Sequence, residues 1–141
     1  MRITTRGRYA LRASLALAKM GKNGELISIN SLSEAESISS VFLEQIFFKL
    51  KKAGIVRSVR GPGGGFTFDH PLDKITVKDI LDAAGEELAA GTCDKHNDDC
   101  GRINGCTSHN VWLKVSELVN EYLKSLTIAS LLESEKNNPE T

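Results

Sequence analysis

Residues 39–68 read SSVFLEQIFFKLKKAGIVRSVRGPGGGFTF, and this stretch decides the fold. Its first half predicts an amphipathic helix, because four apolar side chains recur at the spacing of one helical face: Leu43, Ile46, Phe47 and Leu50. Ser39 suits the N-cap of this helix, and Gly54 stands where a left-handed glycine often ends one. The second half predicts a β-hairpin, in which apolar runs at 55–59 and 66–68 flank a glycine-rich turn.

The segments on either side are also predicted to be helical. Residues 5–20 carry an apolar stripe at helical spacing, and a short helix is expected over 28–36 with Ser28 as its cap. Residues 76–79 resemble a capping box, so a further helix should begin there and end at Gly85. Three helices followed by a two-stranded hairpin describe a winged helix-turn-helix, so the predicted fold is mainly α with a small β-hairpin.

The C-terminal part predicts one long helix. Its apolar residues repeat at alternating intervals of three and four: Trp112, Val115, Val119, Tyr122 and Leu126. Such a seam packs along another helix, from a second copy or from the same chain, and we expect a dimerisation helix. The predicted organisation is a winged helix-turn-helix DNA-binding domain (1–85), a cluster-binding cysteine loop (86–108), a dimerisation helix region (109–132) and a flexible tail (133–141).

The 141 residues carry 18 basic and 18 acidic side chains, but the two signs are unevenly distributed. Residues 1–60 have a net charge of +7, and the remaining residues have −7. This asymmetry favours a polyanion partner for the N-terminal part, although a basic face that is simply solvated would give the same pattern. No apolar run reaches the ~20 residues of a membrane span, and the basic start is not a signal peptide. We therefore expect a cytoplasmic protein with no membrane partner.

The glycine cluster at 61–65 has two interpretations. A phosphate-binding loop of a nucleotide-dependent enzyme needs a helix after the glycines, whereas an alternating, β-prone segment follows here. No Gly-Lys-Ser/Thr motif is present either, so we predict that the protein is not an enzyme. The cluster suits the tip of a wing, because glycines permit positive φ and close approach to a DNA backbone, while Pro62 stiffens the turn. Arg60 would then lie at the edge of a groove, unless an arginine beside the turn is incidental.

The outer face of the helix after Ser39 is the predicted recognition surface for a double-stranded DNA operator. Gln45 can bind adenine through two hydrogen bonds, and Glu44 can accept one from the cytosine amino group. Glu44 could equally be an exposed acid paired with a neighbouring lysine, and Phe48 is expected to pack under a neighbouring element. The predicted DNA-binding residues are Arg2, Arg8, Ser39, Ser40, Glu44, Gln45, Lys49, Lys52, Arg60, Gly61 and Gly63.

Three cysteines and a histidine lie close together in the sequence, as Cys93-x6-Cys100-x5-Cys106-x2-His109. An odd number of cysteines argues against a disulfide framework, and three thiolates are soft ligands that favour an iron–sulfur cluster or zinc. Such a cluster needs a fourth ligand. His109 is the preferred candidate, while His96, an external ligand, a residue of a partner chain, or three thiols with no common role stay open.

RGRYALRASLALA at 6–18, SSVFLEQIFFKLKKAGIV at 39–56, VRGPGGGF at 59–66 and the Cys-Cys-Cys-x2-His set are the most specific motifs. Together they resemble the IscR-type iron–sulfur cluster regulators, which are bacterial homodimeric winged-helix transcription factors. The resemblance covers most of residues 1–132.

The resemblance implies a cluster, most simply [2Fe–2S], and DNA contacts from particular residues. The implied ligands are Cys93, Cys100, Cys106 and His109, and the implied DNA contacts are Glu44, Gln45 and Arg60. Val41 departs from the subgroup, which has a serine there that helps to read the site, and the first cysteine interval is one residue longer than is typical. Arg8 stands near the position from which related regulators supply an acidic ligand, which favours His109 here.

The sequence therefore predicts a homodimeric transcription regulator whose binding to its DNA operator is controlled by an iron–sulfur cluster. The alternative is a winged-helix regulator that binds zinc at the same residues, or whose thiols sense oxidants directly.

Overall fold

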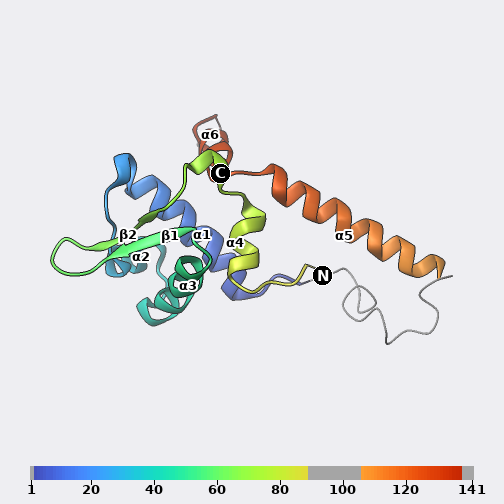
Figure 1. Ribbon diagram of the computed structural model, residues 1–141, viewed down its shortest axis with the longest axis horizontal. Coiled ribbons are helices and arrows are strands. Elements are labelled where there is room, and N and C mark those ends of the chain that lie inside the picture. Colours follow the sequence, from blue (N-terminus) through green and yellow to red (C-terminus); the bar gives the residue numbers. More distant parts are fainter. Residues whose placement is uncertain (1, 89–105, 138–141) are drawn as a thin grey trace.

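The computed structural model describes residues 2–88 and 106–137. Along this part of the chain the elements are α1 (Thr5–Met20), η1 (Lys22–Gly24), α2 (Ile29–Glu36), α3 (Ser40–Lys52), β1 (Val56–Val59), β2 (Gly65–Phe68), η2 (Leu72–Lys74), α4 (Val77–Ala83), α5 (Thr107–Ser125) and α6 (Ile128–Asn137) (Figure 1). Helices dominate, and the two strands form one antiparallel hairpin. The predicted fold class, mainly α with a small β-hairpin, is confirmed.

Three helices begin at the caps that the sequence predicts. The Ser28 hydroxyl accepts a hydrogen bond from the backbone N–H of Ser31 at 3.1 Å, and the Ser39 hydroxyl accepts one from Phe42 at 3.4 Å. At the start of α4, Thr76 and Asp79 each accept a backbone N–H of the other at 3.0 Å, which completes the capping box. These side chains satisfy amide donors that have no partner within the helix.

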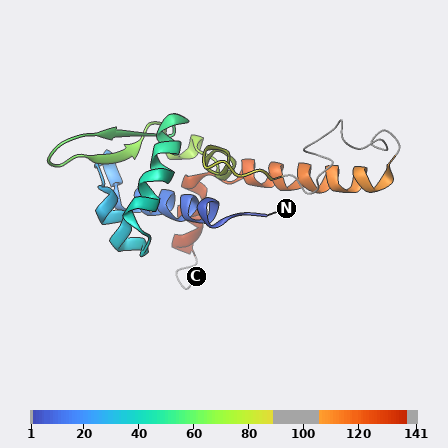
Figure 2. The same ribbon diagram turned by 90° about the horizontal axis from the view of Figure 1, so that it is seen from below.

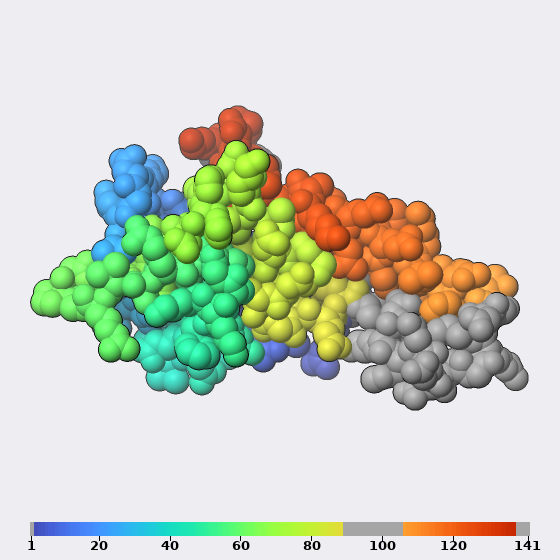
Figure 3. All heavy atoms as spheres, in the orientation of Figure 1, coloured from blue at the N-terminus to red at the C-terminus, as the bar shows by residue number. Residues whose placement is uncertain are grey.

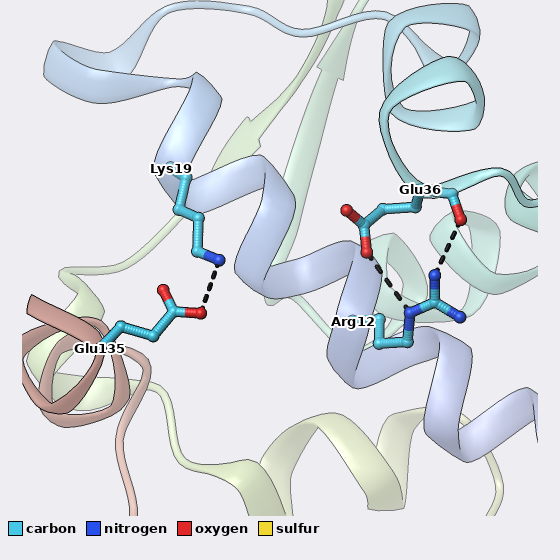
Figure 4. Close-up of polar contacts among 4 residues, drawn as sticks. All are labelled: Arg12, Lys19, Glu36 and Glu135. Carbon is cyan, nitrogen blue, oxygen red and sulfur yellow. Dashed lines mark hydrogen bonds and ion pairs between the residues drawn. The ribbon is translucent and has the colours of Figure 1, made fainter. Parts of the chain in front are cut away.

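The first three helices enclose the main core. α1 turns a face of small alanines inward, so the backbones of α2 and α3 approach it closely. The large, fully buried side chains of this core include Leu17, Leu32, Leu43, Ile46, Phe47 and Leu50. Arg12 joins α1 to α2 at the surface: its Nη2 donates to the Glu36 carbonyl oxygen at 2.8 Å, and its Nε lies 3.4 Å from the Glu36 carboxylate (Figure 4). The burial of its four apolar residues holds α3 with this stripe inside and its opposite face outward.

The wing (residues 56–68) is the hairpin of β1 and β2, with a register that runs from Val56 opposite Phe68 to Val59 opposite Gly65. It projects from the helical body (Figure 2). Ile27 adds a bridge that the sequence did not predict, because its N–H and carbonyl exchange hydrogen bonds with Phe66 at 3.0 and 2.8 Å. A Cβ at Gly65 would lie 2.4 Å from the Ile27 carbonyl oxygen, so only glycine allows this close approach.

The C-terminal part leaves the body and returns to it. α5 extends away from the other helices (Figure 1), and α6 then packs back beside α1. Two backbone hydrogen bonds of 2.9 Å, from Val77 N–H to the Leu126 carbonyl and from Ile128 N–H to the Ile75 carbonyl, fix the junction to the start of α4. Ile128 is fully buried in the main core.

α6 continues to Asn137, past Glu133, where the sequence predicts the start of a polar tail. Thr127 and Ser130 exchange side-chain-to-backbone hydrogen bonds of 2.9 and 3.0 Å that cap its first turn. Glu135 lies 2.8 Å from the Lys19 ammonium of α1, which anchors the last turns (Figure 4). Among the described residues, none of the helices is long and apolar enough to span a membrane.

Candidate DNA interface and cysteine site

The outer face of α3 is exposed along its whole length. Val41 is 63% exposed and Phe48 is 66% exposed, although both are large apolar side chains. The prediction that Phe48 packs under a neighbouring element is wrong, because the helix turns this position away from the core and nothing in the described chain covers it. An exposed helix face of this kind can enter a major groove without rearrangement of the fold.

The polar residues predicted to contact DNA share this face. Glu44, Gln45 and Lys52 are exposed, and Lys49 is half-buried. Glu44 forms no ion pair within residues 2–88 and 106–137, so the pairing with a neighbouring lysine that the sequence allowed is not present there. The two serines at the start of the helix differ in their surroundings. The Ser39 hydroxyl caps the helix, and Ser40 is half-buried.

The tip of the wing is a tight glycine turn, as predicted. Gly61 and Gly63 have φ values of +97° and +76°, a conformation that favours glycine, and the N–H of Gly64 donates to the Gly61 carbonyl at 2.9 Å. Arg60 is exposed immediately before this turn. In the space-filling view the wing, to which Arg60 belongs, projects from the body beside the surface of α3 (Figure 3).

The N-terminal arm (residues 2–8) borders a hollow that Phe42, in the first turn of α3, also lines. Seven residues line this hollow of about 740 Å³: Arg2, Ile3, Thr4, Thr5, Arg6, Arg8 and Phe42. Phe42 also contacts the Tyr9 ring edge-on, with 5.6 Å between the ring centroids. Arg2 and Arg8, which the sequence predicts as phosphate contacts, are therefore exposed beside the recognition helix and add positive charge there.

Of the cysteine set, the structure describes Cys106 and His109, whereas Cys93, His96 and Cys100 lie outside the described residues. Cys106 is a half-buried free thiol at the N-cap of α5, and its Sγ accepts the backbone N–H of His109 at 3.4 Å. The His109 Nδ1 is buried and has no hydrogen-bond partner within the described part of the chain. A thiol sulfur and a buried, unpartnered imidazole nitrogen in the first turn of one helix are both ligand atoms for iron and zinc, so the two residues can contribute to a metal or metal-cluster site.

α5 carries a large apolar surface on the same chain. Its exposed apolar residues are Val111, Trp112, Leu113, Val115, Leu118 and Tyr122. The predicted seam is divided between two surroundings, because Leu126 packs against α4 in a second small core with Val77, while Trp112 and Tyr122 face outward.

Sequence reasoning missed Glu86, a buried carboxylate at the base of the N-terminal arm. Its side chain accepts hydrogen bonds from Thr4 and Gly7, which stand about eighty positions earlier in the chain. The signal in the sequence was the glycine within the RGR motif. The close approach of Glu86 that requires a glycine there is seen only in the three-dimensional structure.

A helix with an exposed polar face, a glycine-tipped wing beside it and a basic arm at its first turn define a winged-helix DNA-binding protein. The chain matches the Rrf2 family, described as iron-dependent transcriptional regulator, over residues 3–134. It is 36% identical over 135 residues to the HTH-type transcriptional regulator IscR of Yersinia pestis, an alignment that covers 96% of this chain and 81% of that one. The chain therefore belongs to the Rrf2 family of transcriptional regulators and is an IscR-type regulator, not an enzyme.

Two solved structures support the fold and the class. IscR of T. potens superposes with a TM-score of 0.76 at 29% identity, over 95% of this chain and 88% of that one. CymR, the global cysteine regulator of B. subtilis, superposes with a TM-score of 0.80 at 28% identity, over 95% of this chain and 98% of that one.

Proposed function

We propose that the protein is a homodimeric, cytoplasmic transcription regulator whose affinity for its operator is controlled by an iron–sulfur cluster, most simply [2Fe–2S]. The proposed ligands are Cys93, Cys100, Cys106 and His109. The observation that carries this proposal is the buried His109 Nδ1, without a partner in the described chain, on the helical turn that the Cys106 thiol caps.

A buried polar nitrogen without a hydrogen bond costs about 1–3 kcal/mol, and a bond from that nitrogen to a ligand would offset this cost. A metal bonded to the imidazole would be such a ligand, and the Cys106 sulfur provides a second donor at the same helix end. When bound, a cluster supplies a centre whose oxidation or loss alters charge and ligand bonds at the start of α5. Cys106 and His109 themselves fix the N-terminal turn of that helix.

The DNA contacts are proposed from the exposed faces. Gln45 and Glu44 would read base edges in the major groove, and Lys49, Lys52, Arg2 and Arg8 would bind phosphates. The amide-rich start of α3 at Ser39 and Ser40 would approach a phosphate. At the wing, Gly61 and Gly63 would allow the backbone to approach the duplex and place Arg60 at the groove edge.

α5 connects the two activities in this proposal. Its N-terminus carries two of the four proposed ligands, and its exposed apolar face would pack against a second copy of the chain. The spacing of two recognition helices in a dimer must match two half-sites on DNA. A change at the ligand end that alters this spacing by enough to shift the binding free energy by about 1.4 kcal/mol would change operator affinity tenfold.

The test is anaerobic purification followed by visible absorption spectroscopy, with iron and acid-labile sulfide measured on the same sample. We expect a coloured protein, and we expect His109→Ala to lose most of the colour. His70→Ala is the matched control, because His70 is an exposed histidine outside the cysteine set. A colourless, iron-free protein that also resists reconstitution would overturn the proposal.

A second candidate is a regulator that binds zinc at the same residues or senses oxidants through its thiols. The free, half-buried Cys106 thiol favours this candidate, as does the likeness to CymR, the cysteine regulator. Elemental analysis separates the two functions. One zinc per chain without acid-labile sulfide, or a metal-free protein whose DNA affinity changes on reversible thiol oxidation, would support the second.

A further inference from the structure

The start of α1 is tied to the segment after α4 by one buried carboxylate. The Glu86 side chain accepts hydrogen bonds from the backbone N–H of Gly7 at 3.0 Å and of Thr4 at 3.3 Å, and a short one from the Thr4 hydroxyl. Thr4 itself provides no side-chain cap for α1, so Glu86 fills that role from a distant part of the sequence. A negative charge at this position also complements the positive end of the helix dipole.

Gly7 is the residue that allows this contact. A Cβ at Gly7 would lie 2.6 Å from the Glu86 Cγ and 2.7 Å from its Oε1, so any larger residue would displace the carboxylate. Glycine within a helix is destabilising by about 0.5–1 kcal/mol relative to alanine, so its presence in the first turn of α1 is explained by this close approach.

Glu86 is charged under ordinary conditions. Burial by itself would raise the pKa of this carboxyl, but the hydrogen bonds from Thr4 and Gly7 and the positive charge of Arg6 outweigh burial and lower the pKa below its usual value. A buried carboxylate held by hydrogen bonds from one short segment fixes the position of that segment, because releasing it would leave a buried charge without partners.

The segment that Glu86 fixes is the N-terminal arm. Figure 2 shows the arm running out from the start of α1, and its arginines line the hollow beside Phe42 of the recognition helix. On the other side, Glu86 follows α4 directly, and Leu88 is buried with Val77 and Leu81 of α4. In the sequence the chain continues from there to Cys93. Glu86 therefore contacts the segment that carries the arginines, and in the sequence it precedes the first proposed ligand, Cys93.

We propose that Glu86 is a positioning residue for DNA binding: it holds the arginines of the N-terminal arm beside the recognition helix, and it links their position to the segment that leads into the cysteines. The link to the cysteines rests on the proposed function. The positioning of the arm does not depend on it.

The test uses the full-length protein and a DNA duplex of mixed sequence, with affinity measured by fluorescence anisotropy at several salt concentrations. Each lost phosphate contact reduces the slope of log affinity against log salt by about 0.9. We expect Glu86→Gln and Thr4→Val to reduce the slope by about one to two per protomer relative to the wild type. Glu25→Gln is the matched control, because it removes the same charge from an exposed carboxylate elsewhere. Thr4→Val removes one hydrogen-bond donor to Glu86 from an exposed position. It therefore still tests the positioning role if Glu86→Gln folds poorly.

The second readout is the ratio of DNA affinities of the cluster-loaded and metal-free forms. We expect this ratio to approach one in Glu86→Gln and to keep its wild-type value in Glu25→Gln. Wild-type slopes in both Glu86→Gln and Thr4→Val would overturn the positioning role. A wild-type ratio in Glu86→Gln would overturn the link to the cysteines. A wild-type protein that takes up no cluster would instead refute the proposed function and that link, while the salt slopes still decide the role of Glu86.

Discussion

α3 and α5 are both amphipathic helices, yet their apolar faces have opposite surroundings. In α3, all four stripe residues are fully buried by the rest of the chain. In α5, which is 19 residues long, Ser116 is the buried residue, and six large apolar side chains are exposed. α3 is therefore completed by its own chain, whereas α5 has an apolar face that the described part of the chain leaves open.

This difference gives the two apolar faces different roles: the face of α3 stabilises the fold, whereas the face of α5 is open to association. Val111, Val115, Leu118 and Tyr122 share one side of α5 and are all exposed, and an exposed apolar stripe marks an interaction surface more often than a solvated one. The alternating three- and four-residue spacing is that of two helices packed along each other. Substitutions in α3 should therefore change the stability of the fold, and substitutions on the open face of α5 should change the association of two copies.

The largest effect is expected from Phe47→Ala. Phe47 is fully buried in the main core, and truncation of a buried phenylalanine typically costs about 3–5 kcal/mol of unfolding free energy. Urea denaturation followed by circular dichroism measures this loss. The neighbouring Phe48→Ala is the control, because that ring is 66% exposed, and its unfolding free energy should change by less than about 0.5 kcal/mol. Equal losses in the two variants would contradict the described orientation of α3.

The next effect is expected from Leu118→Asp on the open face of α5. A charge placed in an apolar helix–helix interface is strongly unfavourable, so we expect a dimeric wild type to become monomeric while its helix content stays the same. Sedimentation velocity at several concentrations measures the change. Lys124→Asp, at an exposed polar position of the same helix, should leave the dimer intact. A variant that stays dimeric would show that this face is covered in some other way.

The elements built from local patterns were predictable from the sequence. The stripe of α3, its Ser39 cap, the capping box of α4 and the glycine turn of the wing are each encoded within a few neighbouring residues, and the structure contains all of them. The exposure of Glu44, Gln45 and Arg60 followed from the same patterns.

The features that were missed join residues that are distant in the sequence. The Ile27 bridge to Phe66 consists of one residue, too short for a strand pattern, and the last turns of α6 form an ion pair with α1 between Glu135 and Lys19. Glu86 falls at the start of the segment predicted as the cysteine loop, and its partner Gly7 lies far away in the sequence, in α1. Phe48 was wrongly predicted to be covered by a neighbouring element, because an apolar residue on a polar face is usually expected to pack against other residues. Local patterns do not encode any of these contacts.

Gln45→Ala tests whether the outer face of α3 reads DNA bases without contributing to the stability of the fold. A two-pronged contact to adenine contributes about 1–3 kcal/mol of discrimination, so affinity for a selected operator should fall by that amount, while affinity for mixed-sequence DNA should change little. Unfolding free energy should stay within about 0.5 kcal/mol of the wild type, because Gln45 is exposed. An equal loss on both DNAs would mean that Gln45 does not read bases.

Arg60→Ala tests whether the wing contacts DNA, and its expected effect on affinity is smaller. Loss of one phosphate or groove-edge contact should weaken binding on every sequence and reduce the salt slope by about 0.9 per protomer. Arg57→Ala is the matched control, since Arg57 is an exposed arginine of β1 that lies 3.9 Å from the Asp69 carboxylate and precedes the turn. We expect both variants to keep the absorption spectrum of the proposed cluster. A lost spectrum in Arg60→Ala would mean that the wing and the cysteine site are coupled.

The smallest effect concerns the acid stability that Glu86 provides. Its pKa in the folded protein is lowered, because hydrogen bonds from Thr4 and Gly7 and the nearby Arg6 charge outweigh the opposing effect of burial. A carboxyl whose folded pKa lies below its unfolded value of about 4.3 stabilises the fold fully above that value, and the contribution is lost as the pH falls through the folded pKa. Unfolding free energy measured by urea denaturation from about pH 7 down to about pH 3 should therefore fall more steeply in the wild type than in Glu86→Gln. Glu25→Gln should follow the wild-type curve, and parallel curves for the wild type and Glu86→Gln would show that the carboxylate does not hold the start of α1 in its charged form.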